Sequence, residues 1–279
     1  MAKRTIGRFM DAALRVAARP EYHRFGPAFQ ALRRLRAFVA ADFGLGRGTG
    51  SGGGRNGEIQ GNPGAGMIPG WASVALAATA ALAYGAGWCW QGPSAVKSAL
   101  KTLATLALAA AAAAFGAPWA VTLGLVLGAA GDLALSRPGQ GAFLAGMAAF
   151  AAGHLAYAGA FLAAGHGWPA PVPAIAVLAL GLSTELWLAP RTGALRGPVR
   201  AYVAVILGMA LAALTLPGSA WAALLGAGLF LASDLMLSVE MFVLPAPAPR
   251  ALSRAVWAAY WSGQALICLG MAGVLGPSP

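Results

Sequence analysis

The feature that most constrains this chain is a series of long apolar segments, separated by short breaks, that runs from Met67 to the C-terminal end. Each segment is close to the ~20 residues that an α-helix needs to cross a bilayer. The breaks are rich in Pro, Gly and charged residues, which end helices. We count eight segments, at 71–90, 98–115, 117–135, 142–164, 171–189, 199–216, 219–238 and 254–275.

The composition agrees with a membrane protein. Hydrophobic residues make up 59% of the chain and charged residues only 10%, against roughly 25% charged in soluble domains. The segments lack the alternation typical of barrel strands, and a helix satisfies its own backbone hydrogen bonds in lipid. We therefore predict an all-α, multi-pass integral membrane protein with eight transmembrane helices, located in a bacterial inner (plasma) membrane.

Residues 1–66 differ from the rest. They hold 11 of the 19 basic residues but 4 of the 8 acidic ones, and they end in a Gly-rich stretch at 44–66 that predicts a flexible tail. An Arg-rich tail fits a membrane surface better than nucleic acid, so no nucleic-acid partner is expected. Three interpretations stay open: an interfacial helix, a targeting peptide, or a wrongly assigned start with Met67 as the true first residue.

The basic residues after Met67 predict the orientation. All eight lie in the first, third, fifth or seventh loop or at its edge, and the even loops have none. The positive-inside rule then places the odd loops in the cytoplasm and both termini outside. The basic tail would demand the opposite. This conflict favours the wrong-start interpretation, and we expect the tail to be dispensable.

Two aspartates interrupt the apolar segments in matching positions. Asp132 in "GDLALS" and Asp234 in "SDLMLS" are 102 residues apart, an offset of four helices. This predicts two parallel four-helix repeats. The fourth helix of each half carries a stripe with the same 4, 3, 4, 3, 4 spacing, although such stripes are more often packing faces. The stripes are Phe143, Met147, Phe150, His154, Tyr157 and Phe161, and Ser253, Trp257, Tyr260, Gln264, Ile267 and Met271.

Other polar residues of the segments fall in the same half of the bilayer as the two aspartates. Ionisable groups at such depth are candidates for function. The candidates are Lys101, His154, Tyr157, Tyr202, Tyr260 and Gln264. Residues 67–279 contain only two histidines, and the two cysteines, Cys89 and Cys268, have no CxxC partner, so no metal site and no cofactor is predicted.

Several stretches resemble the YhhN-like lysoplasmalogenase family over about 71–275. They are "KTLATLALA" at 101–109, "GDLALSRPGQGAFLAGMAAFAAGHLAY" at 131–157, "GPVRAYVAVILGMA" at 197–210, "GLFLASDLMLSVEMF" at 228–242 and "YWSGQALI" at 260–267. The resemblance implies an eight-helix membrane hydrolase that cleaves the vinyl ether of lysoplasmalogens to a fatty aldehyde and a glycerophospho-base. It places the two catalytic carboxyls of the family on Asp132 and Asp234. It does not cover the tail.

This chemistry suits the residues. A vinyl ether is cleaved by protonation of its double bond, which leaves an oxocarbenium ion for water to attack. Two carboxyls in a poorly solvated site can divide the roles of proton donor and stabilising carboxylate, as in glycoside hydrolysis. Lys101, Arg137 or Tyr202 is expected to hold the substrate phosphate, and the other candidates to contact the lysophospholipid.

Two other classes compete with the hydrolase. The first is a small transporter that uses the paired aspartates as a proton or substrate site, and the second is a structural or regulatory membrane protein. An enzyme needs both carboxyls around one lipid-sized pocket, whereas a transporter needs a path that reaches both faces. The clustering of polar groups on one side favours the enzyme. The oligomeric state is not predicted.

Overall fold

The structure, a computed structural model, describes residues 67–275; the interpretations of residues 1–66 lie outside the described residues. Residues 67–275 form eight long α-helices and no strand, which confirms the all-α prediction for this part of the chain. The helices are α3 Met67–Gly87, α4 Ala95–Ala114, α5 Trp119–Leu135, α6 Gln140–Ala164, α7 Pro171–Trp187, α8 Arg196–Ala213, α9 Trp221–Phe242 and α10 Arg250–Met271.

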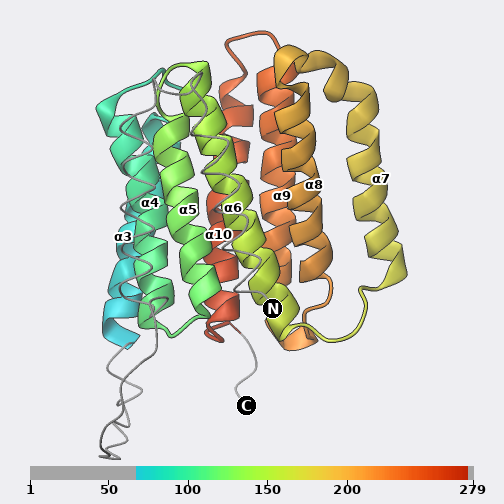
Figure 1. Cartoon of the computed structure of the whole chain (residues 1–279). Coiled ribbons are helices and arrows are strands. Elements are labelled where there is room, and N and C mark those ends of the chain that lie inside the picture. The colour runs from blue at the N-terminus through green and yellow to red at the C-terminus, as the bar shows by residue number, and fades with distance from the viewer. Residues whose placement is uncertain (1–66, 276–279) are drawn as a thin grey trace, which may run out of the picture. The chain divides into compact units, whose positions relative to one another are not determined.

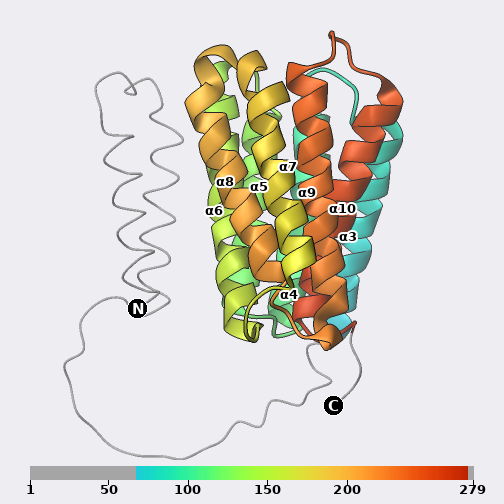
Figure 2. The ribbon, with the colours of Figure 1, turned by 90° about the vertical axis from the view of Figure 1, so that its right-hand side faces the viewer.

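The helices run alternately up and down with short connections, so that the four odd loops meet at one end of the bundle (Figures 1 and 2). These loops are 88–94, 136–139, 188–195 and 243–249. Local signals set the starts of some helices. The Oγ of Ser94 accepts a hydrogen bond from the backbone N–H of Lys97 at 3.1 Å and caps α4, and Pro171 begins α7, where its missing N–H costs nothing.

Helix ends differ from the predicted spans by a few residues. The differences reach four residues, at the start of α3, at both ends of α10 and at the end of α9, which continues to Phe242 instead of ending at 238. The prediction ended at polar residues, but a helix that reaches the membrane surface continues through them. Glu240 therefore sits on the last turn of α9.

Six helical stretches of the described part are long and apolar enough to cross a membrane. They are Met67–Gly87, Ala95–Ala114, Gln140–Ala164, Pro171–Arg191, Gly193–Ala213 and Gly218–Phe242. Helix α5 is apolar but has 17 residues. Helix α10 is long enough, but it carries Arg250, Arg254, Tyr260, Gln264 and two serines. The chain is thus a multi-pass helical membrane protein, and the crossing of α5 and α10 stays a prediction.

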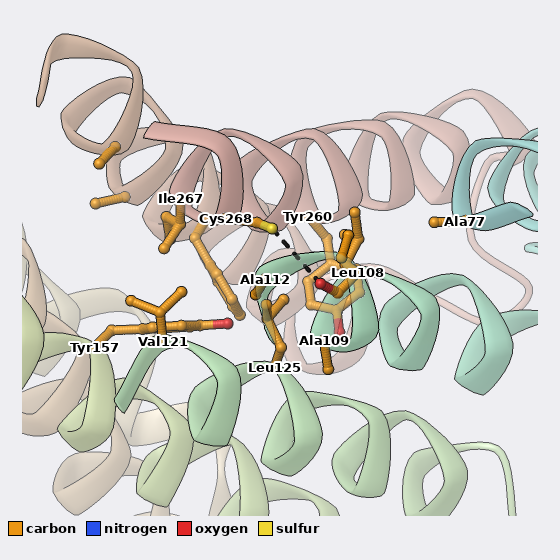
Figure 3. Packing of buried hydrophobic residues seen from close by; sticks show 14 of the residues in the cluster. Ala77, Leu108, Ala109, Ala112, Val121, Leu125, Tyr157, Tyr260, Ile267 and Cys268 are labelled. Carbon is orange, nitrogen blue, oxygen red and sulfur yellow. Dashed lines mark hydrogen bonds between the residues drawn. The ribbon is translucent and has the colours of Figure 1, made fainter. Parts of the chain in front are cut away.

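Small residues bring the helices close together. A Cβ on Gly226 of α9 would lie 2.6 Å from the carbonyl oxygen of Gly263 on α10, so only glycine permits this approach. On the opposite side of α10, the Sγ of Cys268 lies 3.5 Å from the carbonyl oxygen of Leu108 on α4 (Figure 3). Close approach of small residues is the usual way in which helices associate in lipid.

Helix α7 is the least integrated of the eight. It packs mainly against α8 and the short helix that follows it, and Figure 1 shows it at the edge of the bundle. Large apolar side chains cover its outer surface, among them Val172, Ile175, Leu182 and Leu186, which are 64% to 82% exposed. Such a surface is stable when lipid covers it.

Candidate active site

A cavity of about 700 Å³ lies at the odd-loop end of the bundle, and both aspartates are among the residues that line it. Its wall includes Ser136 and Arg137 after α5, Leu195 before α8 and Phe242 at the end of α9. Leu180 and Gly181 of α7 extend the lining to the edge of the bundle. The volume falls in the range of roughly 300–1,000 Å³ typical of small-molecule sites.

Asp132, near the end of α5, is fully buried and is held by three groups. Thr105 Oγ1 and Tyr260 OH each donate a hydrogen bond to its Oδ2 at 2.7 Å. Its Oδ1 lies 3.1 Å from the Nζ of Lys101, whose side chain is 18% exposed. Lys101 and Thr105 are one turn apart on α4, so one face of that helix supplies two of the three groups. The arrangement suits an ionised carboxylate paired with an ammonium group.

Asp234, on α9, has a different environment. Tyr202 OH of α8 donates a hydrogen bond to its Oδ2 at 2.5 Å. His154 Nε2 of α6 lies 2.9 Å from the Tyr202 oxygen and 3.5 Å from the same Oδ2. Because the Tyr202 O–H donates its hydrogen bond to the carboxyl, the Tyr202 oxygen can accept a hydrogen bond from the N–H at His154 Nε2. The Asp234 side chain is 14% exposed, so it can meet a ligand or water in the cavity.

A hydrogen-bonded chain extends from Asp132 into the core. Gln264 Nε2 donates to the Tyr260 oxygen at 3.2 Å, and Tyr157 OH donates to Gln264 Oε1. The ring of Phe230 stands beside this chain and beside His154, with centroid distances of 5.2 Å to Tyr260 and 4.6 Å to His154. Each aspartate therefore has its own set of polar partners, and aromatic rings pack between the sets.

The predicted site residues divide into two groups. Lys101, Tyr202 and Tyr260 line the cavity together with the two aspartates. His154, Tyr157 and Gln264 are not among the lining residues and are at most 1% exposed. The stripe on each fourth helix is long, and only its odd-loop end reaches the cavity. These three side chains lie behind the wall: His154 contacts Tyr202, Gln264 contacts Tyr260, and Tyr157 contacts Gln264.

Several residues of the site are not among those that the sequence pattern singled out. Thr105, a direct partner of Asp132, carried a signal, since it lies one turn after Lys101. Glu240 and Lys97 line the cavity as well, but they sit at helix ends, where a charged residue more often contacts water or lipid head groups. The spacing of residues along a helix does not distinguish a charged residue that lines a cavity from one that contacts water or lipid head groups.

A cysteine, Cys89, also lines the cavity, but its surroundings do not suit a nucleophile. Cys89 lies in the loop after α3, and partial burial raises the pKa of its thiol, so that the thiol stays neutral. Within residues 67–275, no three His, Cys, Asp or Glu side chains come together as a metal site requires. The reactive groups of the cavity wall are therefore its carboxyls and their partners.

Fold and site together define a multi-pass helical membrane protein with two carboxyl centres on one cavity. The sequence model of the YhhN family matches residues 96–271, and the chain belongs to that family. The chain is also 35% identical over 157 residues to the lysoplasmalogenase TMEM86A of Bos taurus. That match covers 53% of this chain and 63% of the bovine protein, so the chain spans less than two thirds of its relative. No solved structure matches the chain.

Proposed function

We propose that this protein is a membrane hydrolase that cleaves the vinyl ether bond of lysoplasmalogens by carboxyl acid/base catalysis. The observation that carries the proposal is that Asp132 and Asp234 line one cavity of lipid-binding size at one end of the bundle. Membership of the YhhN family and the similarity to a bovine lysoplasmalogenase support the choice of substrate.

The two carboxyls suit different roles. Asp132 is surrounded by an ammonium group and two hydroxyl donors, which favour its ionised form. Asp234 accepts one short hydrogen bond and is partly exposed. We assign Asp234 as the proton donor and Asp132 as the fixed negative charge that stabilises the cation. His154, Tyr157 and Gln264 then act from behind the wall, by holding Tyr202 and Tyr260.

The reaction balances with one water. Asp234 transfers its proton to the double-bond carbon remote from the ether oxygen, and the π electrons form the new C–H bond. The adjacent carbon becomes an oxocarbenium ion, which a preorganised negative charge stabilises. Water adds to that carbon and returns a proton to the Asp234 carboxylate. The hemiacetal then breaks its C–O bond, releasing the fatty aldehyde and the glycerol hydroxyl.

The cavity wall provides groups for both ends of a lysophospholipid. Lys97, Lys101 and Arg137 line it near the loops, where basic side chains contact phosphate groups. Apolar side chains of α7, α8 and α9, such as Leu180, Ile206 and Leu231, line the part that lies deeper in the bundle. We propose that the alkenyl chain lies there, and that Met147 and Phe150 of α6 contact it.

The proposed topology has eight membrane crossings in two parallel four-helix repeats. Helix α6 packs on α8 and α10 packs on α4, so the fourth helix of each half contacts the second helix of the other. This reciprocity supports the repeats, and it gives α5 and α10 the same crossing as their counterparts α9 and α6. We place the protein in a bacterial inner membrane with the odd loops in the cytoplasm. A reporter fused after Pro279 is then expected outside.

A transporter is the second candidate, because membrane carboxylates also serve proton coupling. It needs a path to the other face, but the even-loop half below the cavity is packed with fully buried side chains such as Val121, Phe161 and Ile267. This packing favours the enzyme.

The test is aldehyde release by the purified protein from a lysoplasmalogen, with the saturated-ether analogue as control. Release from the vinyl ether alone supports the proposal. Absence of release, or substrate-dependent proton flux across vesicles, contradicts it. Deleting residues 1–66 is expected to leave membrane insertion and release intact.

A further inference from the structure

One carboxylate of the cavity has no role in the reaction just described. Glu240 lies on the last turn of α9, lines the cavity and is half-buried. Its Oε1 accepts a hydrogen bond at 2.8 Å from the Oγ of Ser253, which is 6% exposed on α10. Glu240 forms no ion pair with any residue in the described range 67–275. A partly buried carboxylate without a cation is costly unless a ligand supplies one.

Aromatic rings stand near this carboxylate in the cavity wall. Trp257 lies one turn after Ser253 on α10, and its ring packs on Tyr84 with a centroid distance of 4.3 Å. Both rings line the cavity. A carboxylate together with aromatic faces suits a small organic cation, because the carboxylate supplies charge and the rings supply cation–π attraction.

The charges of the cavity are balanced. Three basic and three acidic residues line it: Lys97, Lys101 and Arg137, and Asp132, Asp234 and Glu240. Lys101 already pairs with Asp132. Arg137 and Lys97, at the loop end of the cavity, are available to an anionic group, although Lys97 Nζ also donates to the Gln91 carbonyl oxygen. Glu240 is available to a cationic group. This distribution suits a zwitterionic head group better than a head group that is only anionic.

We propose that Glu240 binds the ammonium group of a zwitterionic lysophospholipid and thereby determines which head groups the enzyme accepts, while Lys97 and Arg137 bind the phosphate. Ser253 orients the carboxylate. The inference rests on the proposed function for the choice of a lysophospholipid, but it concerns recognition and not the cleavage step.

Binding measurements test the inference independently of turnover. The probes are two saturated-ether lysolipids with the same chain, one with an ethanolamine head group and one with a bare phosphate. In Glu240→Gln, the amide oxygen still accepts from Ser253, so the fold is kept while the charge is lost. We expect the Kd for the ethanolamine lipid to rise about tenfold, since a hydrogen bond to a charged group is lost, and the Kd for the phosphate lipid to stay within about twofold.

Two further variants sharpen the test. Ser253→Ala keeps the charge but frees the carboxylate, so a smaller loss with the same selectivity is expected. Glu185→Gln is the matched control, because Glu185 pairs with Arg200 on α7 and α8 and does not line the main cavity. It is expected to change neither Kd.

Equal weakening of both lipids by Glu240→Gln would show that Glu240 only links α9 to α10, and it would overturn the inference. Unchanged binding of the ethanolamine lipid would overturn it as well. Failure of the proposed function looks different: the wild-type protein would still prefer the ammonium head group, but it would release no aldehyde from the vinyl-ether lipid.

Discussion

The two aspartates occupy equivalent places in the two halves of the molecule, yet their surroundings differ. Each lies on the third helix of its half, and each contacts the second helix of its own half and the fourth helix of the other. Asp132 meets Lys101 and Tyr260 in this way, and Asp234 meets Tyr202 and His154. The aspartate of the first half is therefore fully buried and paired with a lysine, whereas that of the second half is partly exposed and has no lysine partner.

The difference shows how two carboxyls at corresponding positions along the chain can acquire different surroundings. Where a lysine reaches the carboxyl, the pair is neutral as a unit and stable in a low-dielectric surrounding. Where a tyrosine and a histidine take that place, the carboxyl stays partly exposed to the cavity. Substitutions on the two sides are therefore expected to have different consequences.

The largest effect is expected from removing the proposed acid. Asp234→Asn keeps the shape of the side chain but cannot give a proton, so aldehyde release is expected to fall by about 10²–10⁴-fold. Thermal stability in detergent is expected to change little, because no buried cation loses its partner. Asp132→Asn is expected to lower both activity and stability, and the double variant to be little less active than either single. Near-normal aldehyde release by Asp234→Asn would contradict the assignment of Asp234 as the proton donor.

The second-largest effect is expected from breaking the ion pair between Lys101 and Asp132. Lys101→Met leaves the fully buried Asp132 without its cation, and a loss of about 3 kcal/mol or more in the free energy of unfolding is expected. Lys97→Met, one turn earlier on α4, is the matched control with a small effect. Combining Lys101→Met with Asp132→Asn is expected to cost less than the sum of the single changes. Thermal unfolding is measured for Lys101→Met, Asp132→Asn, their combination and Lys97→Met. Strictly additive losses of stability would contradict an interaction between Lys101 and Asp132.

Removing a single hydroxyl compares the two centres directly. Tyr202→Phe takes away the O–H donor of Asp234, and turnover is expected to fall by about 10- to 100-fold. Tyr260→Phe removes one of the three groups that hold Asp132, and a loss of about fivefold is expected, because Thr105 and Lys101 remain. Equal losses in kcat would show that the two centres depend on their tyrosines to the same extent.

The smallest effect is expected at the outer ion pair. Arg200 Nε donates to both carboxylate oxygens of Glu185, at 2.8 and 2.9 Å, but both side chains are more than two fifths exposed. Arg200→Gln is expected to leave both the thermal unfolding midpoint and aldehyde release nearly unchanged, because solvent screens the pair. A large loss of activity would mean that the α7–α8 seam takes part in catalysis.

Much of this architecture was predictable because it depends on local patterns. Apolar length, Pro and Gly breaks, and the odd-loop basic residues predicted the helices and placed the polar groups at one end. The match of "GDLALS" with "SDLMLS" singled out both aspartates. The sequence also placed Lys101 at the same end of the bundle as Asp132, but it predicted a phosphate contact for the lysine and not the ion pair that the structure shows. It could not tell that His154, Tyr157 and Gln264 lie behind the cavity wall, because a stripe has the same spacing whether a cavity or a neighbouring helix faces it.

The sequence by itself determined which residues lie in helices, which end of the bundle holds the polar side chains, and which two carboxyls are exceptional. Only the tertiary structure decided their partners. Tyr260 donates to Asp132 across 128 residues of sequence, and Tyr202 donates to Asp234 across 32. A helical pattern fixes the direction of a side chain relative to its own axis. The neighbour on that side depends on how small residues such as Gly226 and Gly263 let the helices approach, and that is a property of the whole bundle.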